Sequence, residues 1–170
     1  MRAVLLTAHG GFECLELRDD VPVPTCGPHD VLVEVGAAAV NNTEINTRLG
    51  WYSGGGWTGS FEFPRIQGID VCGRIVRVGT DVDASRIGER VLVEPCWRDP
   101  VRFVGSEVDG GFAEFCRVPS QYAHRVASNL SDVELASFPC SYSTAENLLT
   151  RAEVAAGQRV LVTGASGGVG

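Results

Sequence analysis

Residues 160–170 read VLVTGASGGVG and decide the fold class of the C-terminal part of the chain. The run 160–162 is apolar and rich in β-branched residues, which is typical of a parallel strand covered on both faces. The turn after it contains Gly164, Gly167, Gly168 and Gly170. Glycines at such a turn permit a tight bend and let backbone amides approach a pyrophosphate. The stretch therefore predicts the first strand and turn of a nucleotide-binding βαβ unit.

The glycine spacing alone leaves an alternative open. It is G-x-x-G-x-x-G instead of the commoner G-x-G-x-x-G, and a flexible Gly/Ser loop would have the same composition. The preceding apolar strand and the small residues Ala165 and Ser166 favour the phosphate-binding turn.

Composition narrows the class of protein. With 44% apolar and 21% charged residues, the chain has the composition of an ordinary soluble globular protein. The formal net charge of -7 argues against a nucleic-acid or anionic-membrane partner, because basic residues are outnumbered.

No segment has the features of a signal peptide or a membrane span. The apolar run 3–6 is too short for a secretory signal, and Glu34 interrupts the longest apolar candidate, 31–40. We therefore expect a cytoplasmic protein. Its six cysteines form no C-x-x-C pair, so free thiols are expected in place of disulfides.

The order of predicted elements divides the chain. Alternating apolar residues and glycine turns predict strands at 2–6, 14–18, 31–38, 71–78, 90–94 and 112–118. Ser131 with Glu134, and Ser143 with Glu146, form S-x-x-E capping boxes. We expect helices at 132–138 and 144–154, followed by a strand at 159–163.

Four glycine-anchored segments then occur in a fixed order: GIDVCGRIVRVG at 68–79, RIGERV at 86–91, GGFAE at 110–114, and the closing stretch 157–170. In this order the chain resembles the medium-chain dehydrogenase/reductase superfamily, specifically its zinc-lacking quinone oxidoreductase-like branch. The resemblance implies a mainly β GroES-like barrel catalytic domain over residues 1–124. It also implies the first helices and strand of an α/β Rossmann NAD(P)-binding domain over 125–170, which is incomplete.

The resemblance also places two positions that bind the catalytic metal in zinc alcohol dehydrogenases. Their C-x-[ST]-D segment reads Asn41-Asn42-Thr43-Glu44 here, and their G-H-E segment reads Gly68-Ile69-Asp70. Asparagine replaces the cysteine, and isoleucine, which cannot coordinate a metal, replaces the histidine. The family's structural zinc lobe would lie between residues 93 and 110, where Cys96 is the one cysteine. We expect no zinc, although folding could still gather some of Cys72, Cys96, Cys116 and His124.

Asn41, Thr43 and Tyr52 are the candidate catalytic residues. The resemblance puts Asn41 near the nicotinamide, where its carboxamide could also bind a substrate carbonyl; the alternative is an asparagine that caps a turn. Thr43 has the weaker claim. The Tyr52 hydroxyl could donate to a substrate carbonyl, or the ring could be a surface aromatic, and the family's tyrosine aligns with Asn46.

Two further predictions concern substrate and cofactor. The aromatic and glycine residues of 51–63 suit a pliable, apolar substrate wall, or a surface flap. By resemblance, Thr144 contacts the nicotinamide carboxamide, while Gly164, Gly167, Gly168 and Gly170 bind the pyrophosphate; Thr144 could equally begin a helix capped by Ser143. His9, His29 and His124 are each isolated in sequence and are interpreted as surface or packing residues.

The resemblance implies an NADPH-dependent, zinc-independent oxidoreductase that transfers hydride to a quinone or enone, with NADH left open as cofactor. The expected substrate is a small apolar or conjugated carbonyl compound, and the complete protein is expected to be a homodimer. The alternatives are a zinc-type alcohol dehydrogenase with substituted ligands and an inactive isolated portion. The chain alone is not expected to bind NADPH tightly, because the doubly wound fold needs further βα units.

Overall fold

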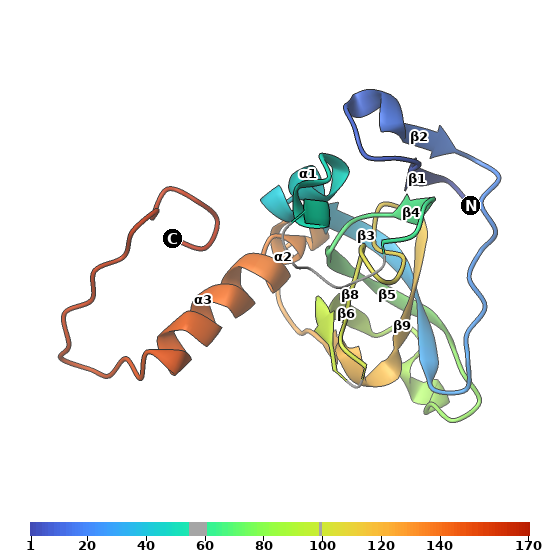
Figure 1. Cartoon of the computed structure of the whole chain (residues 1–170). Coiled ribbons are helices and arrows are strands. Elements are labelled where there is room, and N and C mark those ends of the chain that lie inside the picture. Colours follow the sequence, from blue (N-terminus) through green and yellow to red (C-terminus); the bar gives the residue numbers. More distant parts are fainter. Residues whose placement is uncertain (55–60, 99) are drawn as a thin grey trace.

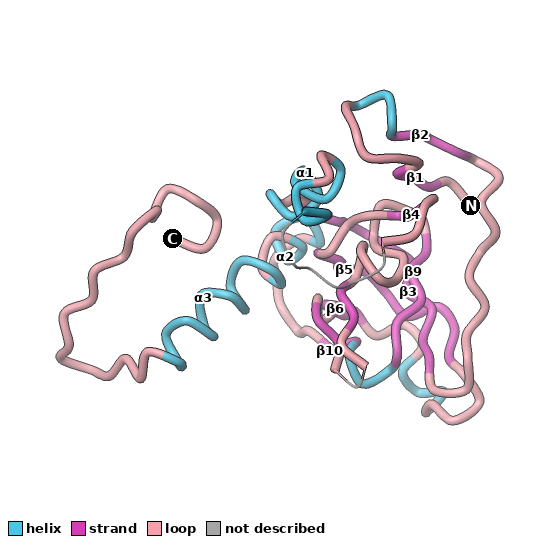
Figure 2. The backbone as a smooth tube through the Cα atoms, viewed as in Figure 1, coloured by secondary structure: helices cyan, strands magenta, loops and turns pink. Residues whose placement is uncertain are grey.

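A computed structural model gives the fold and describes residues 1–54, 61–98 and 100–170. Antiparallel sheets form the main body, and helices follow toward the C-terminus (Figure 1, Figure 2). The strands are β1 (Ala3–Leu6), β2 (Leu15–Arg18), β3 (Asp30–Ala39), β4 (Arg65–Ile66), β5 (Asp70–Val78), β6 (Arg90–Val93), β7 (Cys96–Trp97), β8 (Arg102–Phe103), β9 (Phe115–Pro119) and β10 (Ala123–Arg125). The helices are α1 (Asn42–Arg48), α2 (Asp132–Ala136) and α3 (Pro139–Arg151), with 3-10 turns at Phe12–Cys14, Trp51–Gly54, Ala84–Arg86 and Ser120–Tyr122.

The largest sheet has the strand order β10-β6-β5-β3-β9. Its two long strands, β3 and β5, pair from Val31 opposite Val78 to Ala39 opposite Asp70, with two register shifts. A smaller sheet, β2-β1-β4, and the hairpin β7-β8 complete the β structure. These sheets confirm the mainly β architecture expected for the first part of the chain.

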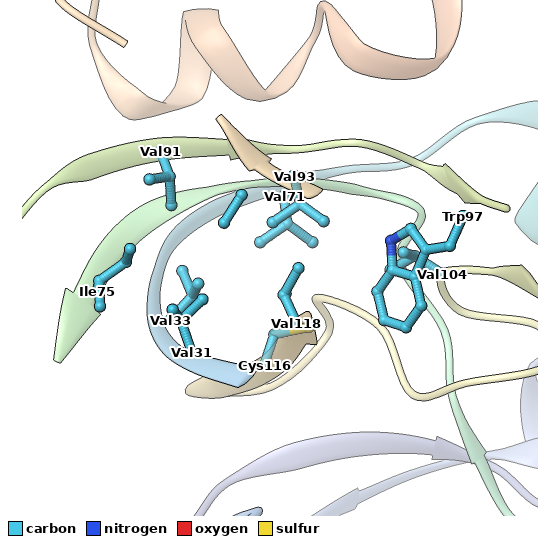
Figure 3. Packing of buried hydrophobic residues seen from close by; sticks show 11 residues of the cluster. Val31, Val33, Val71, Ile75, Val91, Val93, Trp97, Val104, Cys116 and Val118 are labelled. Carbon is cyan, nitrogen blue, oxygen red and sulfur yellow. The ribbon is translucent and has the colours of Figure 1, made fainter. Parts of the chain in front are cut away.

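The core lies inside the curled main sheet (Figure 3). Val31 and Val33 of β3 are fully buried there, while Glu34 is exposed. Val71, Val91 and other apolar side chains from neighbouring strands pack against them. The burial of Val31 and Val33 confirms the apolar face predicted for this strand. Burying one such side chain stabilises the fold by about 1.5–3 kcal/mol.

The GGFAE segment packs on the turn that leads into β5. The amides of Gly111 and Phe112 donate to the carbonyls of Gly68 and Gln67, at 2.8 and 2.9 Å. Gly68 has φ of 102°, a left-handed conformation that favours glycine. Because residues 110–112 bond to this turn, the strand predicted at 112–118 begins three residues later, as β9.

The first predicted helix cap is confirmed and the second is wrong. Ser131 and Glu134 form the capping box of α2. Helix α3 begins at Pro139 instead of Thr144, and its N-cap is Phe138. Proline is well suited to a first helical position because its φ is fixed and it has no N–H. Ser143 and Thr144 therefore lie inside α3.

The strand predicted at 159–163 does not form. Leu161 is 89% exposed, and Val160 and Val162 are about half exposed. A parallel strand needs neighbours to accept its hydrogen bonds, and no strand of residues 1–54, 61–98 or 100–158 lies beside it. Figure 1 shows α3 and the residues after it extending away from the barrel. No helix in the described ranges is long and apolar enough to cross a membrane.

Candidate functional site

The start of α1 is fixed by a buried glutamate. Asn41 is the N-cap residue, and its backbone amide donates to Glu44 Oε2 at 2.8 Å. Glu44 Oε1 accepts the amide of Ile69 at 2.8 Å. Because Glu44 is only 5% exposed, this carboxylate ties α1 firmly to the turn before β5.

Asp70, at the start of β5, is fully buried and joins three segments of the chain. Its Oδ2 accepts the side-chain amide of Asn41 at 2.9 Å. Its Oδ1 accepts the backbone amide of Cys140 at 2.7 Å, which lies in the first turn of α3. Asn41 therefore both begins a helix and holds a buried carboxylate, and one of its two amide hydrogens is committed to Asp70.

Burial dominates the electrostatics of this group. It raises the pKa of Glu44, against the hydrogen bonds from Ile69 and Asn41, and the nearby Asp70 charge acts in the same direction as burial. Burial likewise raises the pKa of Asp70, against the bonds from Asn41 and Cys140. Burial and then the two carboxylates raise the pKa of the Cys140 thiol to about 11, which makes it a weak nucleophile at neutral pH.

A cavity of about 230 Å³ adjoins this group. Two of the candidate catalytic residues, Thr43 and Tyr52, line it together with Ile69. Asn41 does not line the cavity but lies behind it, bonded to Asp70. The other lining residues are His9, Glu44, Thr47, Phe61, Gln67, Phe103, Val104, Gly105, Ser106 and Cys140.

Aromatic rings form one wall of the cavity. The rings of His9 and Phe61 lie 5.9 Å apart, and His9 Nδ1 is 2.9 Å from the Thr47 carbonyl oxygen. The side-chain amide of Asn46 donates to the Tyr52 hydroxyl oxygen at 3.5 Å. Part of the predicted aromatic wall, residues 55–60, lies outside the described residues.

Thr144 and the glycine turn do not line this cavity. Thr144 is exposed on α3, and its hydroxyl donates to the Cys140 carbonyl at 2.7 Å. The turn at 164–170 is exposed throughout, and Gly164 has φ of 66°. Thr144 is nevertheless connected to Asp70 through Cys140, whose amide donates to Asp70 and whose carbonyl accepts from Thr144 and, at 3.4 Å, from the Ser143 hydroxyl.

The expected metal positions hold no ligand set. Ile69 contributes an alkyl group, and Asn41 a carboxamide that is bonded to Asp70. The scattered candidates stay apart: Cys116 is in the core, Cys72 contacts Asp132, and His124 pairs with Glu94. Within the described ranges, no three His, Cys, Asp or Glu side chains are placed to hold a metal ion.

The sequence interpretation missed Glu44, Asp70 and His9 as site residues. Glu44 had a signal, because Asn41 to Glu44 has the spacing of a capping box. Asp70 was visible only as part of a glycine motif. His9 contacts a residue 38 positions away, and nothing local in the sequence predicts that.

Comparison with known proteins agrees with this architecture. Residues 27–128 match the family described as alcohol dehydrogenase GroES-like domain. The whole chain is 37% identical to quinone oxidoreductase from Homo sapiens over 171 residues and covers 47% of that protein. The chain thus spans about half the length of the curated relatives it matches.

Solved structures show the same fold. A crystal structure of a proposed alcohol dehydrogenase from Sinorhizobium meliloti has 45% identity and a TM-score of 0.91, over 99% of this chain and 52% of that one. A cobalt- and zinc-bound alcohol dehydrogenase from Pyrobaculum aerophilum has 28% identity and a TM-score of 0.85, over 99% and 54%. The chain is therefore a member of the alcohol dehydrogenase GroES-like domain family, within the medium-chain dehydrogenase/reductase superfamily.

Proposed function

We propose that the complete protein is an NADPH-dependent, zinc-independent reductase that transfers hydride to a quinone or to the conjugated C=C bond of an enone. The observation that carries this proposal is Ile69 in the cavity wall, beside an Asn41 carboxamide bonded to Asp70. An alkyl group and an engaged carboxamide are poor substitutes for a zinc-binding histidine and cysteine. The similarity to human quinone oxidoreductase supports the same reaction class.

The reaction follows from what these residues can do. Without a Lewis acid to stabilise an alkoxide, substrates already activated by conjugation are favoured. NADPH supplies the hydride. The aromatic wall of the cavity would hold a flat apolar substrate, and the Tyr52 hydroxyl would donate to its carbonyl oxygen.

The cofactor would be held by Asn41 at the start of α1 and by exposed groups on the C-terminal side. Thr144 and the second amide hydrogen of Asn41 would orient the nicotinamide. The amides of Gly164, Gly167, Gly168 and Gly170 would approach the pyrophosphate, because the turn is exposed and its residues are small. The cofactor-binding domain is proposed to begin at residue 125.

The test is a comparison of two reactions in the full-length protein. NADPH oxidation is followed with a simple quinone and with an enone, and NADP⁺ reduction is followed with a simple alcohol. Metal content is measured by mass spectrometry on the same samples. The proposal expects quinone or enone reduction that a chelator does not affect, and less than about a tenth of a zinc ion per chain.

Zinc-type alcohol dehydrogenase is the second candidate, favoured by the similarity to the zinc-bound Pyrobaculum aerophilum structure. About one zinc per chain, with alcohol oxidation that a chelator abolishes, would establish it and overturn the zinc-independent mechanism.

We also propose that the complete protein is cytoplasmic and forms a homodimer. Sedimentation of the full-length protein tests the dimer. Parallel titrations with NADPH and NADH test the choice of cofactor.

A further inference from the structure

The Asp70 carboxylate bonds the barrel side of the site, at Asn41, to the helix side, at Cys140. It is fully buried, and its two oxygens take one donor each: Asn41 Nδ2 at 2.9 Å and the Cys140 amide at 2.7 Å. Among residues 1–54, 61–98 and 100–170, no arginine or histidine forms an ion pair with it. Its charge is therefore balanced by these hydrogen bonds and by the helix it faces.

Asp70 supplies the cap that α3 does not provide for itself. The N-cap residue Phe138 makes no side-chain capping bond, and Pro139 has no N–H to donate. The Cys140 amide is therefore the first donor of the helix, and it points at Asp70. A carboxylate at a helix N-terminus is favoured by the helix dipole. The position of this 13-residue helix thus depends on a side chain 70 positions earlier in the chain.

The same helix turn carries Thr144. Its hydroxyl donates to the Cys140 carbonyl at 2.7 Å. Hydrogen bonds therefore run from Asn41 through Asp70 to Cys140 and on to Thr144. Both residues that would orient the nicotinamide lie at the ends of this path.

We propose that Asp70 is a positioning residue that sets the Asn41 carboxamide and the first turns of α3 relative to each other, and so aligns the nicotinamide with the substrate cavity. This role rests on the proposed function, because it assigns Asn41 and Thr144 to the cofactor. Small misplacements of a bound reactant lower the rate of reaction far more than they weaken binding. Loss of Asp70 should therefore appear mainly in hydride transfer.

The central variant is Asp70→Asn in the full-length protein. Its side chain keeps a carbonyl oxygen for the Cys140 amide but loses the negative charge that favours a helix N-terminus. Its NH₂ group then faces Asn41, whose carboxamide must turn over to accept from it. We expect kcat for quinone reduction to fall by at least about tenfold while KM changes by less than about threefold. Asp83→Asn is the matched control, because Asp83 also accepts a helix-start amide, that of Ser85 at 2.8 Å, in a turn outside the site.

A second measurement needs no activity. Amide hydrogen exchange of residues 140–144 should be faster in Asp70→Asn than in the parent or in Asp83→Asn. The double variant Asn41→Asp with Asp70→Asn should restore protection, because the carboxamide introduced at position 70 could accept from the Cys140 amide and donate to the carboxylate introduced at position 41.

The outcomes separate this inference from the proposed function. If the parent protein reduces neither quinone nor enone, the proposed function fails. Unchanged exchange of residues 140–144 in Asp70→Asn overturns the helix-positioning role by itself. If exchange rises but kcat stays within about threefold of the parent, Asp70 only stabilises the fold and the inference is wrong. A kcat loss that merely follows the unfolded fraction, measured by circular dichroism, overturns it as well.

Discussion

Glu44 accepts the backbone amide of Ile69 at 2.8 Å, so one buried carboxylate fixes both the start of α1 and the cavity-lining turn before β5. The other oxygen of Glu44 accepts the Asn41 amide, at the same distance. Ile69 is thus held in the cavity wall by a group that is itself almost fully buried.

Glu44→Gln should change how stability depends on pH. Burial raises the pKa of Glu44 in the folded chain, whereas the unfolded chain keeps the usual value of about 4.3. The folded state therefore binds the Glu44 proton more tightly than the unfolded state does. The stability that this tighter binding gives is present below about pH 4 and is lost as pH rises through the raised pKa. Urea unfolding at several pH values should show the wild type losing stability relative to Glu44→Gln over that window.

The matched control is Glu16→Gln, which alters an exposed glutamate on β2. It should show no such change relative to the wild type. A wild-type advantage over Glu44→Gln that grows with pH would mean that the hydrogen bonds from Ile69 and Asn41 outweigh burial.

Gly68→Ala should destabilise the fold by about 1–3 kcal/mol. Its φ is 102°, and an added Cβ would lie 2.8 Å from the Phe112 amide nitrogen and 3.0 Å from that of Gly111. Gly88→Ala separates the two causes, because φ there is 89° but nothing lies within 4 Å of the added atom. Thermal unfolding should rank Gly68→Ala below Gly88→Ala, and equal losses would show that backbone conformation alone matters.

Local patterns predicted the barrel well. The alternation around Val31 and Val33 identified the strand and its core face, because burial on one face of a sheet repeats every two residues, whereas burial of Leu32 on the other face was not expected. Pro139 was a local signal for the start of α3 that the sequence interpretation passed over, whereas its capping group, Asp70, is remote in sequence. The strand predicted at 159–163 was wrong for a related reason: a parallel strand depends on neighbours that its own residues do not encode.

The candidate site shows the same division. Thr43, Tyr52 and Ile69, which short motifs singled out separately, line one cavity. The contacts of Asp70 and His9 depend on how distant segments pack, so no motif contained them.

Tyr52→Phe tests the hydroxyl that is proposed to donate to the substrate carbonyl. A general acid of this kind contributes about 10²–10⁴ in rate, so kcat for quinone reduction should fall by at least about a hundredfold in the full-length protein. The ring still lines the cavity, so KM should change little. Tyr122→Phe, which removes a hydroxyl bonded to Arg98 outside the cavity lining, is the control. Equal kcat values for Tyr52→Phe and wild type would exclude Tyr52 as donor.

Restoring the two lost ligands should create a zinc site. Cys140 lies in the same cavity wall as Ile69, and its amide bonds to Asp70 beside Asn41. Asn41→Cys with Ile69→His would therefore supply two ligands next to an existing third, which suits a site with one open position. We expect about one zinc per chain in this variant by mass spectrometry, and its loss when Cys140→Ser is added. Zinc retained without Cys140 would show that the metal binds elsewhere.

The 170-residue chain should not bind NADPH tightly by itself. Its glycine turn is exposed, and the preceding residues 160–162 lack the sheet that would hold the turn's amides in place. Amides that must be ordered on binding lose much of their contribution to affinity. Fluorescence titration should therefore give a dissociation constant weaker than about 100 μM, against about 1 μM or tighter for the full-length protein. Micromolar binding by the chain alone would mean that Asn41, Thr144 and the exposed turn suffice to hold the cofactor.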